Sequence, residues 1–188
     1  MFLRRKPIAE SPCSERAHPP AMSAVPPQEL YNEVAAIAVN ELRRPPLLRE
    51  YARRPPDEQP IFMMAYSAFL LWSLSLGFNG HWKADDIRKA LKAARDAFAI
   101  RPWFDPSIFA NIWKQTQIVM PKESRPGKYG GLVYPAADIF LTATLAGYAL
   151  DSDHDPEFGY HVTLTMERMA EQAKLLATSS GRDYIVHL

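Results

Sequence analysis

The feature that most constrains the fold is an apolar stretch in the first half of the chain. The eighteen residues Ile61–Phe78 contain no charged side chain, and about this length of apolar chain is enough for a helix that spans a membrane. Three serines interrupt the stretch, and basic residues flank it on both sides, so the flanking charges give no orientation bias. We therefore expect that the chain has no membrane span and that this stretch lies in the core of a globular domain.

Two local structures agree with the sequence of this stretch. A helix would be apolar on all sides and would have to be buried. Alternatively, Pro60–Met64 and Phe69–Leu76 would form two strands with a turn near Tyr66 and Ser67. Serines at 73 and 75 alternate with large apolar residues at 72, 74 and 76, which is typical of a half-buried strand. Periodicity alone leaves both structures open.

Length and composition indicate one domain in a reducing compartment. Of the 188 residues, 47% are hydrophobic and 23% are charged, and the net charge is +1, which is not the profile of a dedicated nucleic-acid-binding protein. The single cysteine, Cys13, cannot form a disulfide within the chain, which favours the cytoplasm. Residues 1–25 are predicted to be a disordered lead without a signal peptide, and residues 26–188 are predicted to be a single globular domain.

Helical periodicity dominates the remainder of the chain. Apolar residues recur at helical spacing over 28–38, 85–99 and 105–119. Asp85 or Asp86 is expected to cap the second of these helices, and Asp105 with Pro106 the third. Residues 135–150 are predicted to form a buried helix, followed by an amphipathic helix with apolar positions 162, 166, 169, 173 and 176. Between the Arg-Arg-Pro-Pro sequences at 43–46 and 53–56, we expect loop with one short helical piece, because each proline pair stops a helix.

A short stretch, Phe78-Asn79-Gly80-His81-Trp82-Lys83, is the strongest candidate for a binding site. If the preceding residues form a strand, the stretch lies between a strand and an expected helix, where free amide groups and the helix dipole favour an anion. Gly80 would let a phosphate approach the backbone, Lys83 would supply a cation, and His81 would donate a hydrogen bond or transfer a proton. Trp82 would stack on a base or pack in the core.

This stretch resembles the Gly-x-x-Arg box of the ParB/sulfiredoxin superfamily, which follows a strand and precedes a helix. Two further patches, at 37–45 and at 59–61, are similar to the entry of that fold and to the strand before its box. The resemblance implies an α+β domain, with a small ParB/sulfiredoxin-like sheet and a helical C-terminal half. It also implies that Arg43 or Arg44 forms a second phosphate contact.

The resemblance further implies a nucleotide ligand, such as ATP with Mg²⁺. Members of the superfamily hydrolyse nucleotides or cut DNA, and Osa-type fertility-inhibition proteins of plasmids, which are of about this size, block DNA transfer by conjugation. We therefore expect ATPase and DNase activity, with DNA and components of the conjugation or type IV secretion machinery as partners. His81 and Glu41 are the candidate catalytic residues, while Asp85 and Asp86 are other carboxylates near the box.

The chain departs from the superfamily pattern at two positions, and these differences limit which activities of the superfamily can be expected of it. His81 stands where sulfiredoxins have their nucleophilic cysteine, so sulfinic-acid reduction, which needs a thiolate, is not expected. Lys83 replaces the arginine of the box and keeps the charge without the bidentate fork. The alternative to this whole reading is an all-α bundle that serves as a non-enzymatic protein-interaction module, in which the polar stretch is only a turn.

Overall fold

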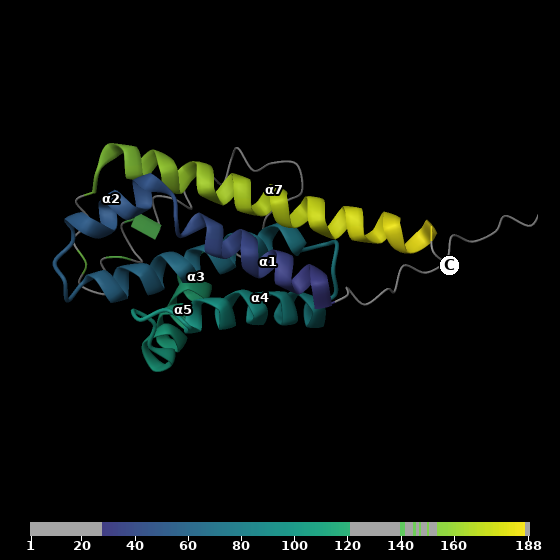
Figure 1. Ribbon diagram of the computed structural model, residues 1–188, viewed down its shortest axis with the longest axis horizontal. Helices are drawn as coiled ribbons and strands as arrows, with labels where there is room; N and C mark the ends of the chain where they lie inside the picture. The colour runs from purple at the N-terminus through teal and green to yellow at the C-terminus, as the bar shows by residue number, and fades with distance from the viewer. Residues whose placement is uncertain are drawn as a thin grey trace, which may run out of the picture.

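The protein is helical throughout the residues that the structure describes. The computed structural model describes residues 28–120 and 154–186, with side chains up to 179, and positions 140, 141, 145, 147 and 150. The helices in these regions are α1 (Gln28–Glu41), α2 (Pro45–Arg53), α3 (Gln59–Phe78), α4 (Ala84–Ala99), α5 (Pro106–Val119) and α7 (Pro156–Val186). No strand occurs among the described residues (Figure 1). The expected α+β fold with a small sheet is therefore wrong, and the described residues agree with the all-helical alternative.

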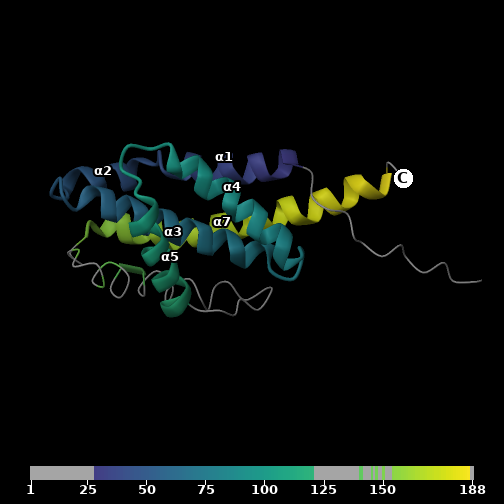
Figure 2. The same ribbon diagram turned by 90° about the horizontal axis from the view of Figure 1, so that it is seen from below.

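The helices pack in two layers, and α3 lies at the centre of the bundle. The most extensive contacts join α3 with α7 and α1 with α4. As Figures 1 and 2 show, the pair α1 and α4 lies against the pair α3 and α7, and α5 packs on α3. Helix α3 thus has neighbours on several sides, and all its residues from Phe62 to Phe78 except Ser75 are buried.

The serines of α3 explain why its strand-like pattern was misleading. Ser73 donates its hydroxyl hydrogen to the Phe69 carbonyl oxygen at 2.8 Å, and Ser75 donates to the Trp72 carbonyl oxygen at 2.6 Å. A serine that bonds to the preceding helical turn satisfies its own hydroxyl and can be buried in a helix. The alternation of serine with large residues therefore did not mark the two faces of a strand. Of the two structures that the sequence left open for this stretch, one continuous helix forms, and the strands at 60–64 and 69–76 do not.

Helix α3 also meets the length and hydropathy expected of a membrane span. Its most apolar eighteen-residue window has a mean hydropathy of 1.7, but 89% of that window is buried against the other helices. This burial is what the core helix of a soluble protein shows, because the neighbouring helices replace the lipid as the apolar surroundings.

The predicted helix ends are confirmed in part. Asp105 caps α5 by accepting hydrogen bonds from the amides of Ser107 and Ile108, each at 2.8 Å. The first proline pair begins α2, which is the short helix expected between the two Arg-Arg-Pro-Pro sequences. Lys83, not an aspartate, is the N-cap of α4, and Asp85 and Asp86 lie in its first turn. The lead at 1–25 and most of the helix predicted at 135–150 lie outside the described residues.

Small residues allow α3 and α7 to approach closely. A Cβ atom at Gly77 would lie directly against the carbonyl oxygen of Ala170 and 2.7 Å from the Cβ of Ala173. No side chain fits there without moving one of the two helices, because the nearest obstacle is backbone.

We expect Gly77→Ala to lower the free energy of unfolding by about 2 kcal/mol or more, since one added methyl group forces the α3–α7 contact apart. Urea unfolding followed by circular dichroism measures the change. Gly80→Asn is the matched control: Gly80 has a φ of +83° but open space around its Cβ position. Asparagine tolerates this backbone conformation, so its cost is expected to stay below about 1 kcal/mol. Equal losses for the two variants would contradict the packing described here.

Candidate ligand-binding site

The predicted phosphate box forms the turn between α3 and α4. Asn79, Gly80 and His81 are exposed there. The amides of His81 and Trp82 both donate to the Phe78 carbonyl oxygen, at 3.0 and 3.1 Å, and therefore do not point outward toward an anion. Two aspartates occupy the first turn of α4, and their negative charges oppose a phosphate at this helix end. The amides that bond to Phe78 and the two aspartates of α4 therefore make this turn a poor match for the predicted phosphate site.

Trp82 is part of the packing between helices. Its ring stacks on Phe78 with a centroid distance of 4.4 Å and an interplanar angle of 8°, and it meets the edge of Tyr31 at 6.3 Å. The Tyr31 hydroxyl in turn donates to Asp86 at 3.3 Å. Of the two roles predicted for Trp82, core packing is the one that its surroundings indicate.

Glu41 is held far from the box by ion pairs. It is 2% exposed and accepts hydrogen bonds from Arg44 at 3.1 Å and from Nε of Arg168 at 3.0 Å. Tyr31, which touches the box, lies ten residues before Glu41 on α1, a rise of about 15 Å along the helix. The structure therefore does not bring the predicted catalytic pair, His81 and Glu41, together. Among the described residues, no group of three or more His, Cys, Asp or Glu is placed to hold a metal ion.

A buried polar network connects Glu41 with α3 and α7. Arg168 donates to the hydroxyl of Thr165 at 3.0 Å. The Tyr66 hydroxyl lies 3.3 Å from that of Thr165 and 2.9 Å from Nε2 of His161. Burial, reinforced by the nearby charge of Arg168, lowers the pKa of His161 to about 4, and burial raises the pKa of Tyr66. Tyr66, His161, Thr165 and Glu41 are buried and only Arg168 is partly exposed, so the network contributes mainly to the packing of the bundle.

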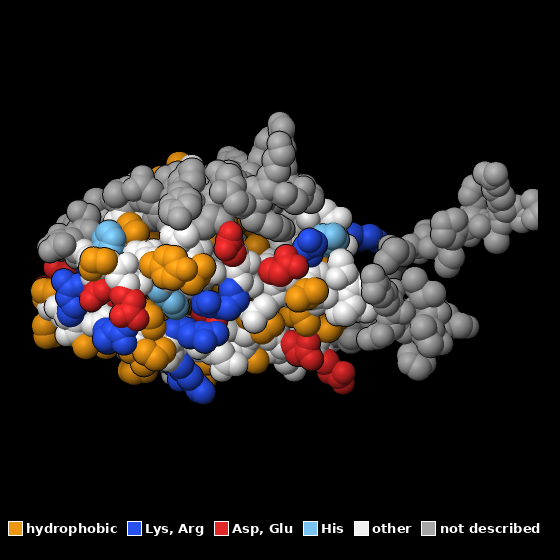
Figure 3. All heavy atoms as spheres, turned by 90° about the horizontal axis from the view of Figure 1, so that it is seen from above, with side chains coloured by type: hydrophobic (Ala, Val, Ile, Leu, Met, Phe, Trp, Pro, Cys, Tyr) orange, Lys and Arg blue, Asp and Glu red, His pale blue; other side chains and the backbone are white. Residues whose placement is uncertain are grey.

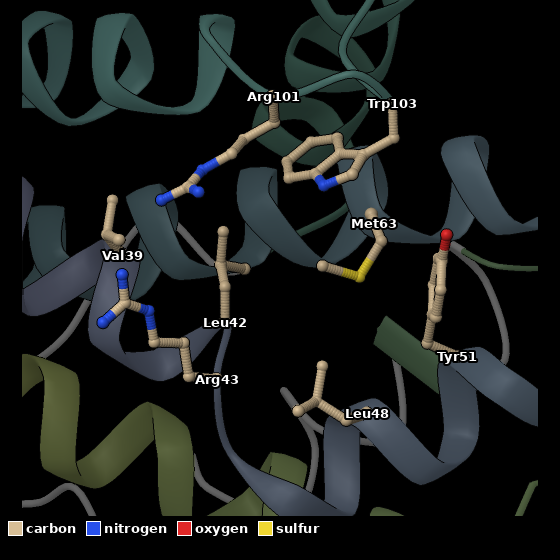
Figure 4. A pocket seen from close by; sticks show the side chains of 8 residues that line it. All are labelled: Val39, Leu42, Arg43, Leu48, Tyr51, Met63, Arg101 and Trp103. Atoms are coloured by element: carbon tan, nitrogen blue, oxygen red, sulfur yellow. The ribbon is translucent and has the colours of Figure 1, made fainter.

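A cavity of about 200 Å³ opens between α1, α2, α3 and the segment that joins α4 to α5. The end of α1, the middle of α2 and the segment after α4 each contribute side chains, and the floor is formed by a methionine of α3. Figure 4 shows the lining residues, which are Val39, Leu42, Arg43, Leu48, Tyr51, Met63, Arg101 and Trp103.

The two arginines of this cavity differ from all other arginines whose side chains the structure describes. Every other one forms an ion pair with an aspartate or a glutamate. Arg43 and Arg101 form no ion pair or side-chain hydrogen bond with a described residue, and the lining residues include no acid. Two guanidinium groups thus face one small space without a counter-charge, which makes the cavity attractive to an anion.

Helix α2, which supplies two lining residues, is fixed by a buried carboxylate. Glu50 is 1% exposed and accepts hydrogen bonds from Arg53 at 3.0 Å and Arg54 at 2.8 Å. It also accepts a bond from the backbone amide of Asp155 at 3.3 Å, just before α7 begins. The position of Leu48 and Tyr51 in the cavity wall is therefore set by contacts with α7.

A second, larger hollow lies between α3, α4 and α5. It measures about 550 Å³ and includes Asn79, Lys114 and the exposed Ile118 in its lining. It has one cationic side chain and mainly apolar walls, so it can form fewer charged contacts with an anion than the first cavity.

No known protein family matches this chain, and comparisons with curated proteins and with solved structures found no match either. The case for a site therefore depends on the geometry alone. Of the predicted site residues, only Arg43 lines the cavity. Sequence reasoning missed Tyr51, Arg101 and Trp103. The only sequence signal for Arg101 and Trp103 was that a basic and an aromatic residue stand in the short link between two strongly predicted helices.

The low pKa of His161 predicts that stability depends on pH. The unfolded chain binds the proton of this residue near pH 6.5, whereas the folded chain binds it only near pH 4. The contribution of neutral His161 is therefore complete above about pH 6.5 and is lost as the pH falls toward 4. We expect it to account for about 3 kcal/mol of the free energy of unfolding between these values.

Urea unfolding at several pH values, for the wild type and for His161→Gln, measures this contribution. The glutamine keeps a polar group at the position but does not titrate, so the pH dependence is expected to be flatter in the variant. Parallel curves for the two proteins would show that His161 is not the source of the acid sensitivity.

Proposed function

We propose that the protein binds a nucleotide or a similar anionic ligand with a planar ring, and that this ligand occupies the cavity lined by Arg43 and Arg101. The observation that carries the proposal is the contrast between these two arginines and the others. Each remaining arginine with a described side chain has a carboxylate partner, whereas these two share a cavity without one.

The lining chemistry suits such a ligand. Guanidinium groups form paired, charge-assisted hydrogen bonds with phosphate oxygens. The indole of Trp103 and the phenol of Tyr51 provide flat apolar surface for a ring. Arg43 is exposed and Arg101 is half-buried, so both guanidinium groups are accessible to an anion that enters from solvent. An anion that contacts both gains charge-assisted hydrogen bonds from each.

The proposal keeps the predicted ligand class but moves its site. The superfamily resemblance placed the phosphate at Gly80, after a strand, and that strand is part of α3. ATP hydrolysis, DNA cleavage, Mg²⁺ as a cofactor, interference with conjugative transfer, secretion-machinery partners and a cytoplasmic location stay predictions. On the face seen in Figure 3, Lys and Arg side chains are interspersed with Asp and Glu, which is not the continuous basic stripe that favours a DNA backbone.

A protein-interaction module is the second candidate, because apolar side chains are exposed at the cavity. Leu48 is 45% exposed in its wall, and Ile100, next to Arg101, is 79% exposed. Arginine and aromatic residues beside exposed apolar ones are typical of interface centres. The partner would present an acidic side chain to the two arginines.

Calorimetric titration of the full chain with AMP and with ATP tests the first candidate. We expect at least one nucleotide to bind to the wild type. Arg43→Gln and Arg101→Gln should each raise the dissociation constant about tenfold or more, since a hydrogen bond to a charged group contributes about 1.5–3 kcal/mol.

Lys83→Gln is the matched control, because it removes one cation from the originally predicted site. It should leave the dissociation constant unchanged. Loss of binding in this variant, with binding kept in the two arginine variants, would place the phosphate at the turn before α4. Absence of nucleotide binding by the wild type would reject the first candidate and favour the protein-interaction module.

A further inference from the structure

We infer, on the basis of the proposed function, that the cavity selects a single phosphate group joined to a planar ring, as in a nucleoside monophosphate or an aryl phosphate, over a nucleoside triphosphate. The inference rests on the charge of the lining residues, on the placement of the two guanidinium groups, and on the size of the cavity.

The charge of the cavity matches one phosphate group. A phosphate monoester carries a charge of about −1.5 to −2 at neutral pH, and Arg43 and Arg101 together supply +2. A triphosphate would bring further negative charge that no other lining residue neutralises. Mg²⁺ commonly offsets this charge when it is held by protein carboxylates and substrate phosphates together, but the lining residues include no Asp or Glu to hold it.

The arrangement of the side chains separates a charged end from a ring-binding end. Figure 4 shows the guanidinium groups of Arg43 and Arg101 on the same side of the cavity, close to Val39. Trp103 and Tyr51 lie away from that side, with Met63 between the two rings and Leu42 between Met63 and the guanidinium groups. A ligand with one anionic group and one ring, joined by a short link, can contact both ends at once.

The size of the cavity also favours a monophosphate over a triphosphate. Its volume of about 200 Å³ is below the range of about 300–1,000 Å³ that is usual for sites of drug-sized ligands, so part of any nucleotide stays outside the cavity. A chain of three phosphates would have to leave the arginine end or displace the ring from the aromatic end. Either change removes one of the two sets of contacts that favour binding.

The lining offers few groups that could distinguish one base from another. Apart from the arginines, the polar side-chain groups are the Tyr51 hydroxyl and the Trp103 indole N–H. Strong discrimination between related ligands requires buried polar groups that one ligand satisfies and the other does not. We therefore expect AMP and GMP to bind with dissociation constants within a few-fold of each other.

The experiment is a calorimetric titration of the full chain without Mg²⁺ at constant ionic strength. The probes are AMP, ATP, phenyl phosphate, ribose 5-phosphate, which has no aromatic ring, and adenosine, which has no phosphate. We expect AMP or phenyl phosphate to bind at least tenfold more tightly than ribose 5-phosphate and adenosine, and several-fold more tightly than ATP. The tighter binder of AMP and phenyl phosphate shows whether the cavity better accommodates a nucleoside or a simple aryl group.

Two variants connect this preference to the cavity. Trp103→Leu should weaken AMP but leave ribose 5-phosphate unchanged, because only AMP uses the aromatic end. Arg101→Gln should weaken both. If ATP binds as tightly as AMP and the binding still requires Arg43 and Arg101, the proposed function stands and the selectivity inferred here is wrong. If neither nucleotide nor phenyl phosphate binds, both proposals fail.

Discussion

The fold depends on the burial of α3, an uncharged helix of twenty residues that no single neighbour can cover. Helix α7 packs along it, α5 and α4 cover other parts, and α1 and α2 make smaller contacts. The burial of this apolar surface is the largest favourable contribution to folding that the sequence offers. The glycine and alanines at the α3–α7 contact bring the two backbones close together, and Ser73 and Ser75 of α3 bond their hydroxyl groups to backbone carbonyl oxygens of the same helix. Each of these features helps α3 to be buried in the bundle.

The charged residues are arranged around this core in pairs. Glu41 and Glu50 are buried, yet each accepts hydrogen bonds from two arginines, which offsets the loss of hydration. An ion pair between Glu41 and Arg168 connects α1 with α7, and a hydrogen bond from the backbone amide of Asp155 to Glu50 connects α2 with the start of α7. Arg43 and Arg101 differ from this pattern, because neither forms an ion pair with a described residue. This contrast is the basis of the proposed anion site.

Much of the helical structure could be predicted from the sequence. The periodicity that placed helices at 28–38, 85–99 and 105–119 reports which side of a helix is buried, and that signal is local. The apolar stretch has no such signal, because a helix that is buried on all sides has no polar face. Its serines also alternate with large apolar residues, which is the pattern of a half-buried strand. The superfamily resemblance then reinforced the error, since it required a strand before Gly80. The cavity could not be predicted, because Arg43, Tyr51 and Arg101 come together only through the packing of separate helices.

The ion pair between Glu41 and Arg168 has a consequence for how this protein can change over evolution. Arg43 follows Glu41 by two residues, so the wall of the cavity and an anchor of the bundle share the same end of α1. A mutation that shifts the backbone at this end of α1 would therefore also disturb the ion pair of Glu41 with α7 and lower the stability of the domain. New ligand preferences would therefore arise more readily through the segment after α4, where Arg101 and Trp103 are placed. That link can vary while the anchor of α1 stays intact.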